Sequence, residues 1–524
     1  MLARCGMLGW LRREQVVPVA VDSGGVVVVP APMHAADRDG SLAPKRWRKG
    51  RGVRAGDTAA PGRVIPIREG APRFGLRLDT RKLAGLYWAD MQILYTSQEP
   101  LQDIANRLKQ VTAADPEREA SVRAIIERVR TEGDKALREL SLQFDGEEYS
   151  CAPVSDAEFA AAYESVAPAY LEAVRSAAAN IRRFHSQQVP HSWFDADATG
   201  VILGQMVRPL ERVGVYAPGG TAAYPSTVLM SAIPAKVAGV REIVLCTPPR
   251  WATPEVLVAA REAGVTSMYR LGSAWAIAAM AYGTETVPRV DKICGPGGPY
   301  VVLAKKLVFG QVGIESLPGP TEVFVIADHT ARADWVAADM LAQAEHGGID
   351  GVSPCVLVTT SEQLARAVAD ELGRQLARLA RREAAERSVE ATGLLVVANS
   401  LAEAAELANL IAPEHLELVV EDAWALLPMI KNAGAVLMGE WTPEPVGDYV
   451  AGPSHVLPTG GTARFSSPLS VEEFVKRSSL IHYSRQALLR DGPSAVQLAE
   501  AEGLGAHAEA VRCRLRDNPE PREA

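Results

Sequence analysis

The segment that decides the fold runs from Arg212 to Met230 and reads RVGVYAPGGTAAYPSTVLM. Its apolar run Val213–Tyr216 has the length and valine content of a buried strand, and the glycine-rich turn Ala217–Thr221 follows directly. A helical stretch over 226–239, with Ser226 as a candidate N-cap, completes the unit. A strand, a glycine turn and a helix in this order indicate a parallel sheet covered by helices.

The same alternation continues along the chain. Further apolar runs predict buried strands over 243–246, 323–326, 355–358, 394–397 and 435–438. Helical periods predict helices over 156–184, 254–264, 333–346, 361–386 and 423–432. From about Val471 the chain is predicted to be helical again. We therefore assign the chain to the α/β class, with two α/β units.

The composition excludes several classes of protein. Of the 524 residues, 48% are hydrophobic and 23% charged, as in ordinary globular proteins, and the length requires two or more domains. The net charge of −8 argues against a nucleic-acid partner. No apolar run approaches the roughly 20 residues that span a membrane. The six cysteines are scattered without C-x-x-C spacing, which favours a reducing, cytoplasmic location.

Residues 1–90 differ from the rest of the chain. They hold 16 basic and 8 acidic residues, a net charge of +8, whereas the remainder carries −16. Apart from Val26–Val29 they show no sustained period, and we expect disorder. Three interpretations remain: a transit peptide, against which Glu14 and Asp22 argue; a basic arm for nucleic acid; or an untranslated stretch, with Met91 opening the mature chain. We favour the last, or a tail without a role.

The sequence lacks the common nucleotide-binding and metalloprotease motifs. G-x-G-x-x-G, G-x-x-x-x-G-K-S/T and H-E-x-x-H are all absent. Glycine-rich segments do occur at Ala217–Thr221 and Cys294–Gly298, and α/β proteins bind ligands at the carboxyl ends of parallel strands. Taken alone, however, each segment is more simply a tight turn.

Four groups of polar residues stand in largely apolar surroundings. Gln343 and His346 lie three apart on a predicted helix and therefore share one face. The other groups are the adjacent pair Glu414 and His415, Asp448 with His455, and Glu502 with His507. Taken singly, each is more simply a capping group or a satisfied core residue, and spacing alone does not assemble them into one site.

Several long segments of the chain are not general features of α/β proteins. They are RVGVYAPGGTAAYPSTVLM at 212–230, GTETVPRVDKICGPGG at 283–298, LAQAEHG at 341–347, APEHLEL at 412–418, GEWTPEPVGDYVAGPSHVLPT at 439–459 and AEGLGAH at 501–507. On these segments the chain from about residue 91 to 515 resembles the histidinol dehydrogenase family, zinc- and NAD-dependent enzymes of histidine biosynthesis. Residues 1–90 lie outside the resemblance.

The resemblance implies two intertwined, incomplete Rossmann-like domains with small helical terminal elements, in a domain-swapped homodimer whose active sites are shared. Carried over, residues 91–114 form a small N-terminal element. Residues 115–215 plus 321–469 form the first α/β domain, and 216–320 form an inserted second α/β domain. Residues 470–524 form a helical dimerisation element.

The resemblance also implies a zinc site and a catalytic pair. His415 matches the general base that takes the alcohol proton, and Glu414 matches the acid/base that activates water. The family's zinc ligands, which also meet the substrate, fall on Gln343, His346, Asp448 and His507, the last from the partner chain. Besides His415, the remaining substrate contacts fall on Thr321, where the family often has serine, His455 and Glu502.

The positions that match NAD contacts depart from the family pattern. Tyr216 matches a tyrosine that contacts NAD. Trp275 stands where the family has glutamine, and Gly298 where it has asparagine, so two of three polar contacts are lost. Trp275 either stacks on the dinucleotide or fills core space at the start of a helix over 274–282.

The function that follows from the resemblance is the NAD-dependent oxidation of L-histidinol to L-histidinal and then to L-histidine. An alternative is a paralogous zinc-dependent dehydrogenase for another small polar alcohol, such as a sulfonated diol. A non-catalytic descendant is disfavoured, because all four ligand types and the pair Glu414 and His415 are present.

Overall fold

The computed structural model describes residues 20–21, 27–28, 91–108, 115–219, 222–347 and 351–516. The chain separates into two compact units, Met1–Arg77 and Leu78–Ala524. In the first unit, β1 (Ala20–Val21) pairs with β2 (Val27–Val28) in antiparallel fashion. The other expectations for residues 1–90 lie outside the described residues.

One parallel sheet is built around the segment from Arg212 to Met230. It contains β6 (Arg212–Tyr216), β7 (Glu242–Thr247), β8 (Ser267–Arg270), β9 (Lys292–Cys294) and β10 (Gly313–Ile314). The spatial order is β10-β9-β6-β7-β8, and every pairing is parallel. The order reverses between β6 and β9, which is where open α/β sheets bind ligands, outside the carboxyl ends of the strands.

Helices cover both faces of this sheet. Their bounds are α6 (Pro225–Ala238), α7 (Pro254–Ala263), α8 (Ser273–Tyr282) and α9 (Pro299–Val308). One apolar cluster joins α6 and α7 to the sheet, and a second joins α8 and α9 to its other face. The almost wholly apolar α8 is buried over most of its length, since α2 and α3 cover it from outside.

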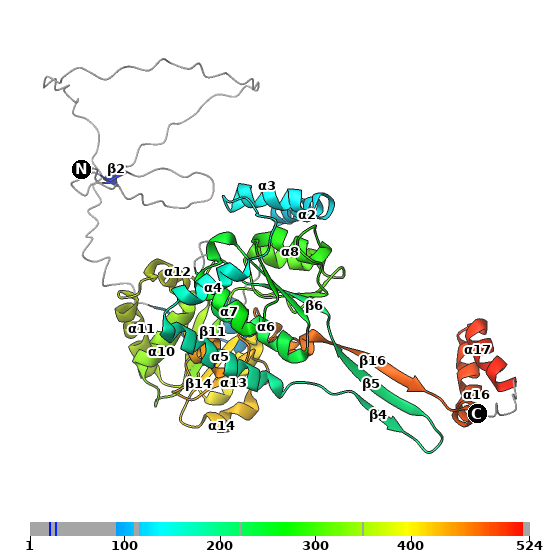
Figure 1. Ribbon diagram of the computed structural model, residues 1–524. Coiled ribbons are helices and arrows are strands. Elements are labelled where there is room, and N and C mark those ends of the chain that lie inside the picture. Colours follow the sequence, from blue (N-terminus) through cyan, green and yellow to red (C-terminus); the bar gives the residue numbers. More distant parts are fainter. Residues whose placement is uncertain are drawn as a thin grey trace, which may run out of the picture. The chain divides into compact units, whose positions relative to one another are not determined.

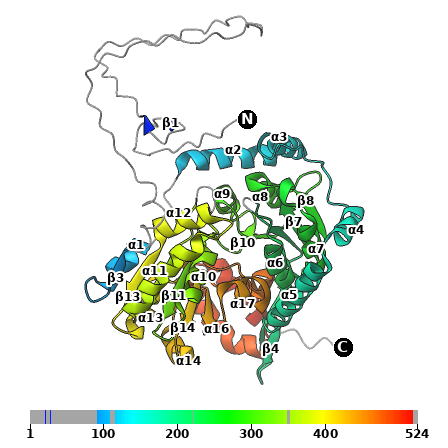
Figure 2. The same cartoon turned by 90° about the vertical axis from the view of Figure 1, so that its left-hand side faces the viewer.

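The helices that precede the sheet pack onto it, which differs from the expected division into domains. They are α2 (Pro116–Glu132), α3 (Asp134–Phe144), α4 (Asp156–Ser165) and α5 (Pro168–Ser186). Figure 2 shows α2 beside α8 and α9, and the clusters place α4 and α5 against α6 and α7. Residues 115–186 therefore belong with the sheet of 212–314, whereas we expected them with 321–469. The one helix predicted over 156–184 is two, because Val166 is extended and Pro168 opens a new helix.

A second parallel sheet repeats the same strand order. It contains β3 (Ile93–Tyr95), β11 (Val323–Ala327), β12 (Cys355–Thr359), β13 (Leu394–Val397), β14 (His415–Val419) and β15 (Ala435–Met438). The order β15-β14-β11-β12-β13-β3 matches that of the first sheet, with β3 added at one edge. The prediction of an α/β fold with parallel sheets is confirmed, and Ile93–Tyr95 of the expected small N-terminal element join this sheet as β3.

Helices on this sheet depart from the sequence prediction in two places. Their bounds are α1 (Leu101–Leu108), α10 (Ala333–Ala344), α11 (Glu362–Leu376), α12 (Arg382–Thr392), α13 (Leu401–Ile411), α14 (Ala423–Leu426) and the 3₁₀ turn η2 (Leu427–Met429). The helix expected over 361–386 is two helices, and the one expected over 423–432 is a single turn of α-helix followed by η2. Short turns connect the remaining segments: η1 (Pro249–Trp251), α15 (Glu444–Val446), η3 (Gly447–Ala451), η4 (Thr462–Arg464) and η5 (Val471–Phe474).

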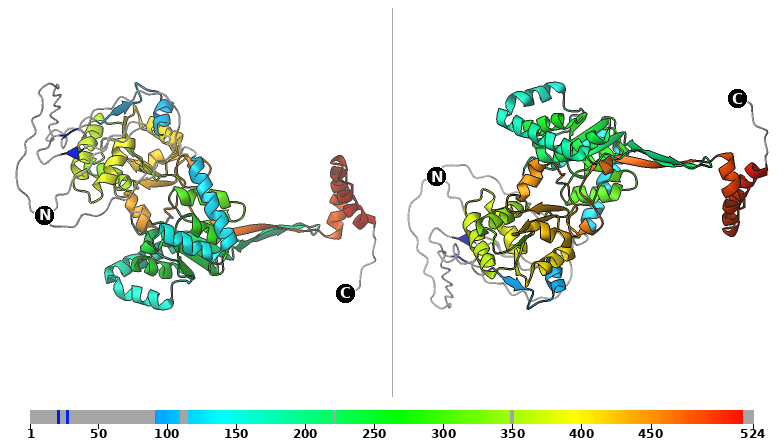
Figure 3. Two further views of the ribbon diagram at one scale, coloured as in Figure 1. Left: turned by 90° about the horizontal axis from the view of Figure 1, so that it is seen from above. Right: turned by 90° about the horizontal axis from the view of Figure 1, so that it is seen from below.

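A three-stranded antiparallel arm leaves the two sheets. It is made of β4 (Trp193–Ala196), β5 (Ile202–Pro209) and β16 (Val475–His482), and it leads to α16 (Arg485–Ala501) and α17 (Gly505–Arg516). Figures 1 and 3 show β5 and β16 side by side, running away from the sheets toward α16 and α17. The expectation of a purely helical segment from Val471 is therefore wrong at β16, whose polar sequence shows no apolar strand signal.

Candidate active site

The polar residues of interest gather at the amino edge of the second sheet. His415 is the first residue of β14, and Thr321 immediately precedes the strand region of β11. Gln343 and His346 lie at the end of α10, which returns toward this edge after β11. This edge lies opposite the carboxyl ends of the strands, where open α/β sheets commonly bind ligands. The carboxyl edge of the first sheet contributes through Thr227, whose hydroxyl lies 3.1 Å from Nε2 of His455.

Gln343 is the most informative residue of the site. Its side chain is fully buried, yet neither the amide oxygen nor the amide nitrogen has a hydrogen-bond partner. Buried polar atoms are normally paired, and leaving them unpaired costs about 1–3 kcal/mol per group. The unpaired amide therefore indicates a ligand that the side chain is built to meet.

His346 follows Gln343 by three residues, and its backbone N–H donates to the Gln343 carbonyl at 3.1 Å. Ligand atoms of His346, Glu444 and Asp448 all fall within 4.8 Å of one another. Asp448 sits on η3, a π-helical turn, and such turns are frequent at functional sites. Burial lowers the pKa of the His346 imidazole. For Asp448, burial favours a higher pKa, but the hydrogen bond from His415 and the nearby imidazoles outweigh burial and lower the pKa of the carboxyl group. A neutral imidazole, a carboxylate and an amide oxygen are a donor set that suits Zn²⁺.

The pair Glu414 and His415 is held by the backbone of Glu322. The carboxylate Oε2 of Glu414 accepts a hydrogen bond from the Glu322 N–H at 2.9 Å. Ring atom Nδ1 of His415 lies 3.2 Å from the Glu322 carbonyl oxygen, and Nε2 lies 3.4 Å from Oδ1 of Asp448. The carbonyl fixes the orientation of the ring, so that Nε2 faces the pocket of Asp448.

The electrostatics of this pair follow from burial and neighbouring acids. Burial opposes protonation of His415, but Glu414, Asp448 and Glu444 outweigh it and raise the pKa of the imidazole to about 10. Burial raises the pKa of Glu414, and a hydrogen bond from the Thr321 side chain acts in the other direction. Thr321 is thus brought to the pair through its hydroxyl.

Glu502 and His507 are not brought to this site. Glu502 caps the end of α16 and His507 lies on α17, and both residues are exposed. Figure 1 shows these helices at the far end of the arm, away from α10 and β14. Within the described ranges, the metal-type cluster contains Glu444 in addition to His346 and Asp448, and does not include His507.

Sequence reasoning missed a group of buried carboxylic acids around the site. Burial raises the pKa of Glu322 to about 7, of Glu444 to about 8 and of Asp339 to about 6. Glu417, in the middle of β14, accepts a hydrogen bond from the Glu444 N–H at 2.9 Å. Glu417 could have been found, because a glutamate between Leu416 and Leu418 is unusual in a buried strand.

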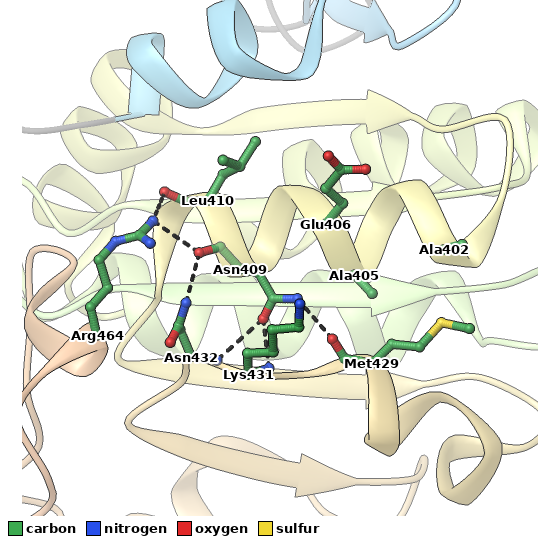
Figure 4. Close-up of a pocket in the computed structure, with 9 residues that line it drawn as sticks. All are labelled: Ala402, Ala405, Glu406, Asn409, Leu410, Met429, Lys431, Asn432 and Arg464. Carbon is green, nitrogen blue, oxygen red and sulfur yellow. Dashed lines mark hydrogen bonds between the residues drawn. The ribbon is translucent and has the colours of Figure 1, made fainter.

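A separate cavity of about 490 Å³ lies beside α13 and contains none of the residues above. Figure 4 shows its lining, in which the Arg464 guanidinium meets the carbonyl oxygens of Asn409 and Leu410. Arg464 therefore satisfies carbonyls at the end of α13, the helix that leads into Glu414.

The candidate NAD residues lie at the carboxyl edge of the first sheet. Tyr216 ends β6, and its buried hydroxyl accepts a hydrogen bond from the Ser273 N–H at 2.9 Å. Gly298 is the N-cap of α9, and a Cβ atom there would meet nothing within 4 Å. Trp275 is only 4% exposed, and its ring stacks on Phe144 at 5.5 Å between centroids. This packing favours the interpretation of Trp275 as a core residue.

Replacing Trp275 with alanine should therefore destabilise the fold by about 3–5 kcal/mol, the usual cost of deleting a core aromatic side chain. Thermal unfolding measures it, and Trp424→Ala, at a ring that is 74% exposed, is the matched control. An unchanged melting temperature together with a raised Michaelis constant for NAD⁺ would show that the ring meets the cofactor.

Cys294, which ends β9 beside Gly295, is a tempting nucleophile for an aldehyde intermediate. Its side chain is fully buried, and burial raises the pKa of the thiol well above its usual value, so little thiolate forms. Cys294→Ala should keep most activity through both oxidation steps, as should Cys246→Ala at the equally buried neighbour. Release of aldehyde with loss of the second step alone would contradict this prediction.

The chain is similar to known histidinol dehydrogenases along almost the whole second unit. The family model described as histidinol dehydrogenase matches residues 108–515. The histidinol dehydrogenase of Moorella thermoacetica is 54% identical over 400 residues, which cover 75% of this chain and 94% of the relative. That of Bacillus subtilis is 50% identical over 411 residues, covering 78% and 96%. The crystal structure of the Elizabethkingia anophelis enzyme matches with a TM-score of 0.77 at 36% identity, over 81% of this chain and 98% of that one. The chain belongs to the histidinol dehydrogenase family.

Proposed function

We propose that this chain oxidises L-histidinol to L-histidine through L-histidinal, using NAD⁺ at a zinc site. The observation that carries the proposal is the fully buried, unpaired amide of Gln343, grouped with His346, Asp448 and the pair Glu414 and His415. The relatives at about half identity are all named histidinol dehydrogenase, so another polar alcohol, such as a sulfonated diol, finds no support.

Zinc would be held by Gln343, His346 and Asp448 together with His507 of the partner subunit. When bound, the ion would act mainly as a template that orients the substrate's alcohol carbon toward the nicotinamide. The rest of the chemistry rests on side chains of the chain. Glu414 and His415 are buried, and the low dielectric around them strengthens their charge interactions.

In the first step, Nε2 of the neutral His415 imidazole takes the hydroxyl proton while hydride leaves the alcohol carbon for NAD⁺, giving the aldehyde. This nitrogen faces the proposed zinc ligand Asp448, with 3.4 Å between Nε2 and Oδ1, whereas Nδ1 faces the carbonyl of Glu322. A zinc ion on Asp448 would offset the negative charge that otherwise favours the protonated imidazole. In the second step, Glu414 takes a proton from the water that adds to the aldehyde. Loss of a second hydride from the hydrated carbon to another NAD⁺ then leaves the carboxylic acid.

We also propose a homodimer in which each site is completed by the arm of the other subunit. The distance of α16 and α17 from β14 within one chain supports this. The arm exposes large apolar side chains as well: Trp193 is 56%, Phe194 73% and Ile481 70% exposed. Apolar surface of this kind marks a protein interface.

The compartment is proposed to be the cytoplasm. The five described cysteines are free thiols, as a reducing compartment requires. Separately, no helix in the described part of the chain has both the length and the apolar character needed to cross a membrane.

The proposed function is tested with purified zinc-loaded protein, limiting L-histidinol and excess NAD⁺. We expect two NADH and one L-histidine per L-histidinol consumed, and growth of a histidine auxotroph that carries the gene. Failure to reduce NAD⁺ with L-histidinol, with turnover of another polar alcohol, would overturn the assignment of the substrate.

A further inference from the structure

The first sheet has the strand order of a dinucleotide-binding unit but lacks one of its usual side chains. In such units an acidic residue at the end of the strand next to the central one binds a ribose hydroxyl of the adenosine half. Here that strand is β7, and it continues as Thr247-Pro248-Pro249-Arg250, with no acid. The ribose of a bound dinucleotide would lack its usual acceptor unless another element supplied one.

Asp145 reaches this position from outside the sheet. It follows α3, and its Oδ1 lies 3.5 Å from the place where a Cβ of Gly272 would stand, next to Pro248. Gly272 follows β8, Pro248 follows β7, and Tyr216, which interacts electrostatically with Asp145, ends β6. The carboxylate therefore lies over the carboxyl ends of three adjacent strands, on the β7 side of the order reversal.

The carboxylate of Asp145 has no structural partner that would explain its position. Its Oδ2 atom is buried and accepts no hydrogen bond, and among the described residues no basic side chain lies within ion-pair distance. Asp145 does not serve as a cap of α8 either. The N-cap of that helix is Gly272, without a side-chain cap bond, and the N–H of Ser273 donates to the Tyr216 hydroxyl. Burial and the nearby Glu147 raise the pKa of Asp145 to about 6, which two donated hydrogen bonds would reverse.

The position of Asp145 is fixed by packing rather than by polar bonds. The preceding residue, Phe144, stacks its ring on Trp275 of α8, with centroids 5.5 Å apart and an interplanar angle of 20°. This contact ties the end of α3 to the start of α8. It holds Asp145 in place even though its own oxygen is unpaired.

We propose that Asp145 accepts hydrogen bonds from the adenosine ribose hydroxyls of NAD⁺ and selects NAD⁺ against NADP⁺. The inference rests on the proposed use of NAD⁺. A carboxylate gains charge-assisted bonds from two hydroxyls, and it repels the 2′-phosphate of NADP⁺. Arg250, whose guanidinium lies over the ring of Trp251 at 5.3 Å, would otherwise favour the phosphate. Asp145 would thus favour NAD⁺ over NADP⁺ even though the loop after β7 carries the cation of Arg250.

The test uses the full-length zinc-loaded protein and the isosteric variant Asp145→Asn, with Glu148→Gln, at an exposed acid three residues on, as control. Direct titration of NAD⁺ and 2′-deoxyadenosine NAD⁺ gives dissociation constants without turnover. For Asp145→Asn we expect NAD⁺ binding to weaken about tenfold to a hundredfold, and the preference over NADP⁺ to fall by at least as much. The wild-type protein should bind the deoxy analogue more weakly than NAD⁺. The Asp145→Asn variant should bind the two ligands with nearly equal affinity.

Maximal turnover at saturating NAD⁺ and the Michaelis constant for L-histidinol should stay unchanged in Asp145→Asn. An unchanged NAD⁺ dissociation constant, or an undiminished penalty for the deoxy analogue in the variant, would overturn the role of Asp145. Either result would leave the proposed function standing if the wild type still makes NADH from L-histidinol. Conversely, a wild type that binds NAD⁺ through Asp145 but leaves L-histidinol untouched would refute the proposed function alone.

Discussion

Replacing Gln343 with methionine is expected to abolish zinc binding and turnover while making the metal-free protein more stable. The side chain is fully buried and both amide atoms lack partners. Methionine fills nearly the same volume without polar atoms, so the variant loses the penalty of an unpaired buried amide, about 1–3 kcal/mol. A residue that served only packing or folding would not show these opposite signs.

The measurement is chemical unfolding of wild type and Gln343→Met in chelator and in zinc. With zinc present the wild type should be the more stable protein, because the ion binds only the folded state. Gln343→Glu, which keeps a side-chain oxygen, is the control for metal binding. A Gln343→Met protein that is destabilised without metal, yet retains a full equivalent of zinc, would contradict the assignment of Gln343 as a ligand.

Replacing Lys305 with methionine is expected to lower the free energy of unfolding by about 3–5 kcal/mol, the usual result of breaking one side of a buried ion pair. Lys305 is completely buried, and its Nζ donates to Glu315 at 2.6 Å and to the Gly295 carbonyl at 3.0 Å. Glu315 in turn accepts from the Gly295 N–H at 2.8 Å. The pair thus fixes both backbone groups of the turn that follows β9.

Lys306→Met is the matched control, because this neighbouring lysine is exposed. The double variant Lys305→Met with Glu315→Leu should recover part of the lost stability, since no unpaired charge is left buried. Equal melting temperatures for Lys305→Met and Lys306→Met would contradict the structural role of the pair. A raised Michaelis constant for NAD⁺ should accompany the loss of stability, because the glycine turn lies at the carboxyl edge of the first sheet.

The apolar strands of the fold could be predicted because a short continuous run of apolar residues is typical of a buried strand. Val323–Ile326 and Cys355–Val358 were expected and lie within β11 and β12. The strand β14 was not predicted, because His415 and Glu417 interrupt its apolar residues. Both are buried polar groups that serve the site, so the pattern fails where function requires polar atoms in a core strand. The arm was missed for the opposite reason: β5 and β16 are largely solvent-facing and lack an apolar alternation.

The site itself could not be assembled from spacing. Gln343 and His346 share a helix, and that much follows from their separation of three residues. Asp448 and His415 are brought to them only by the order of strands in the second sheet, which no local pattern encodes. The resemblance to a known family supplied that grouping, and it did not point to Glu322, Glu444 or Asp145. Those residues became visible through burial and unpaired atoms, which only a structure displays.

The central claim is that one subunit supplies His415 while the other supplies His507 to the same site. It is tested most directly by mixing two inactive variants, His415→Ala and His507→Ala, under conditions in which subunits exchange. Half of the dimers formed at random are hybrids, and each hybrid holds one intact site, so about a quarter of the wild-type rate of NADH formation should return. Mass measurement of the hybrid dimers shows whether subunits have exchanged. If hybrids have formed and no activity returns, the shared site is contradicted.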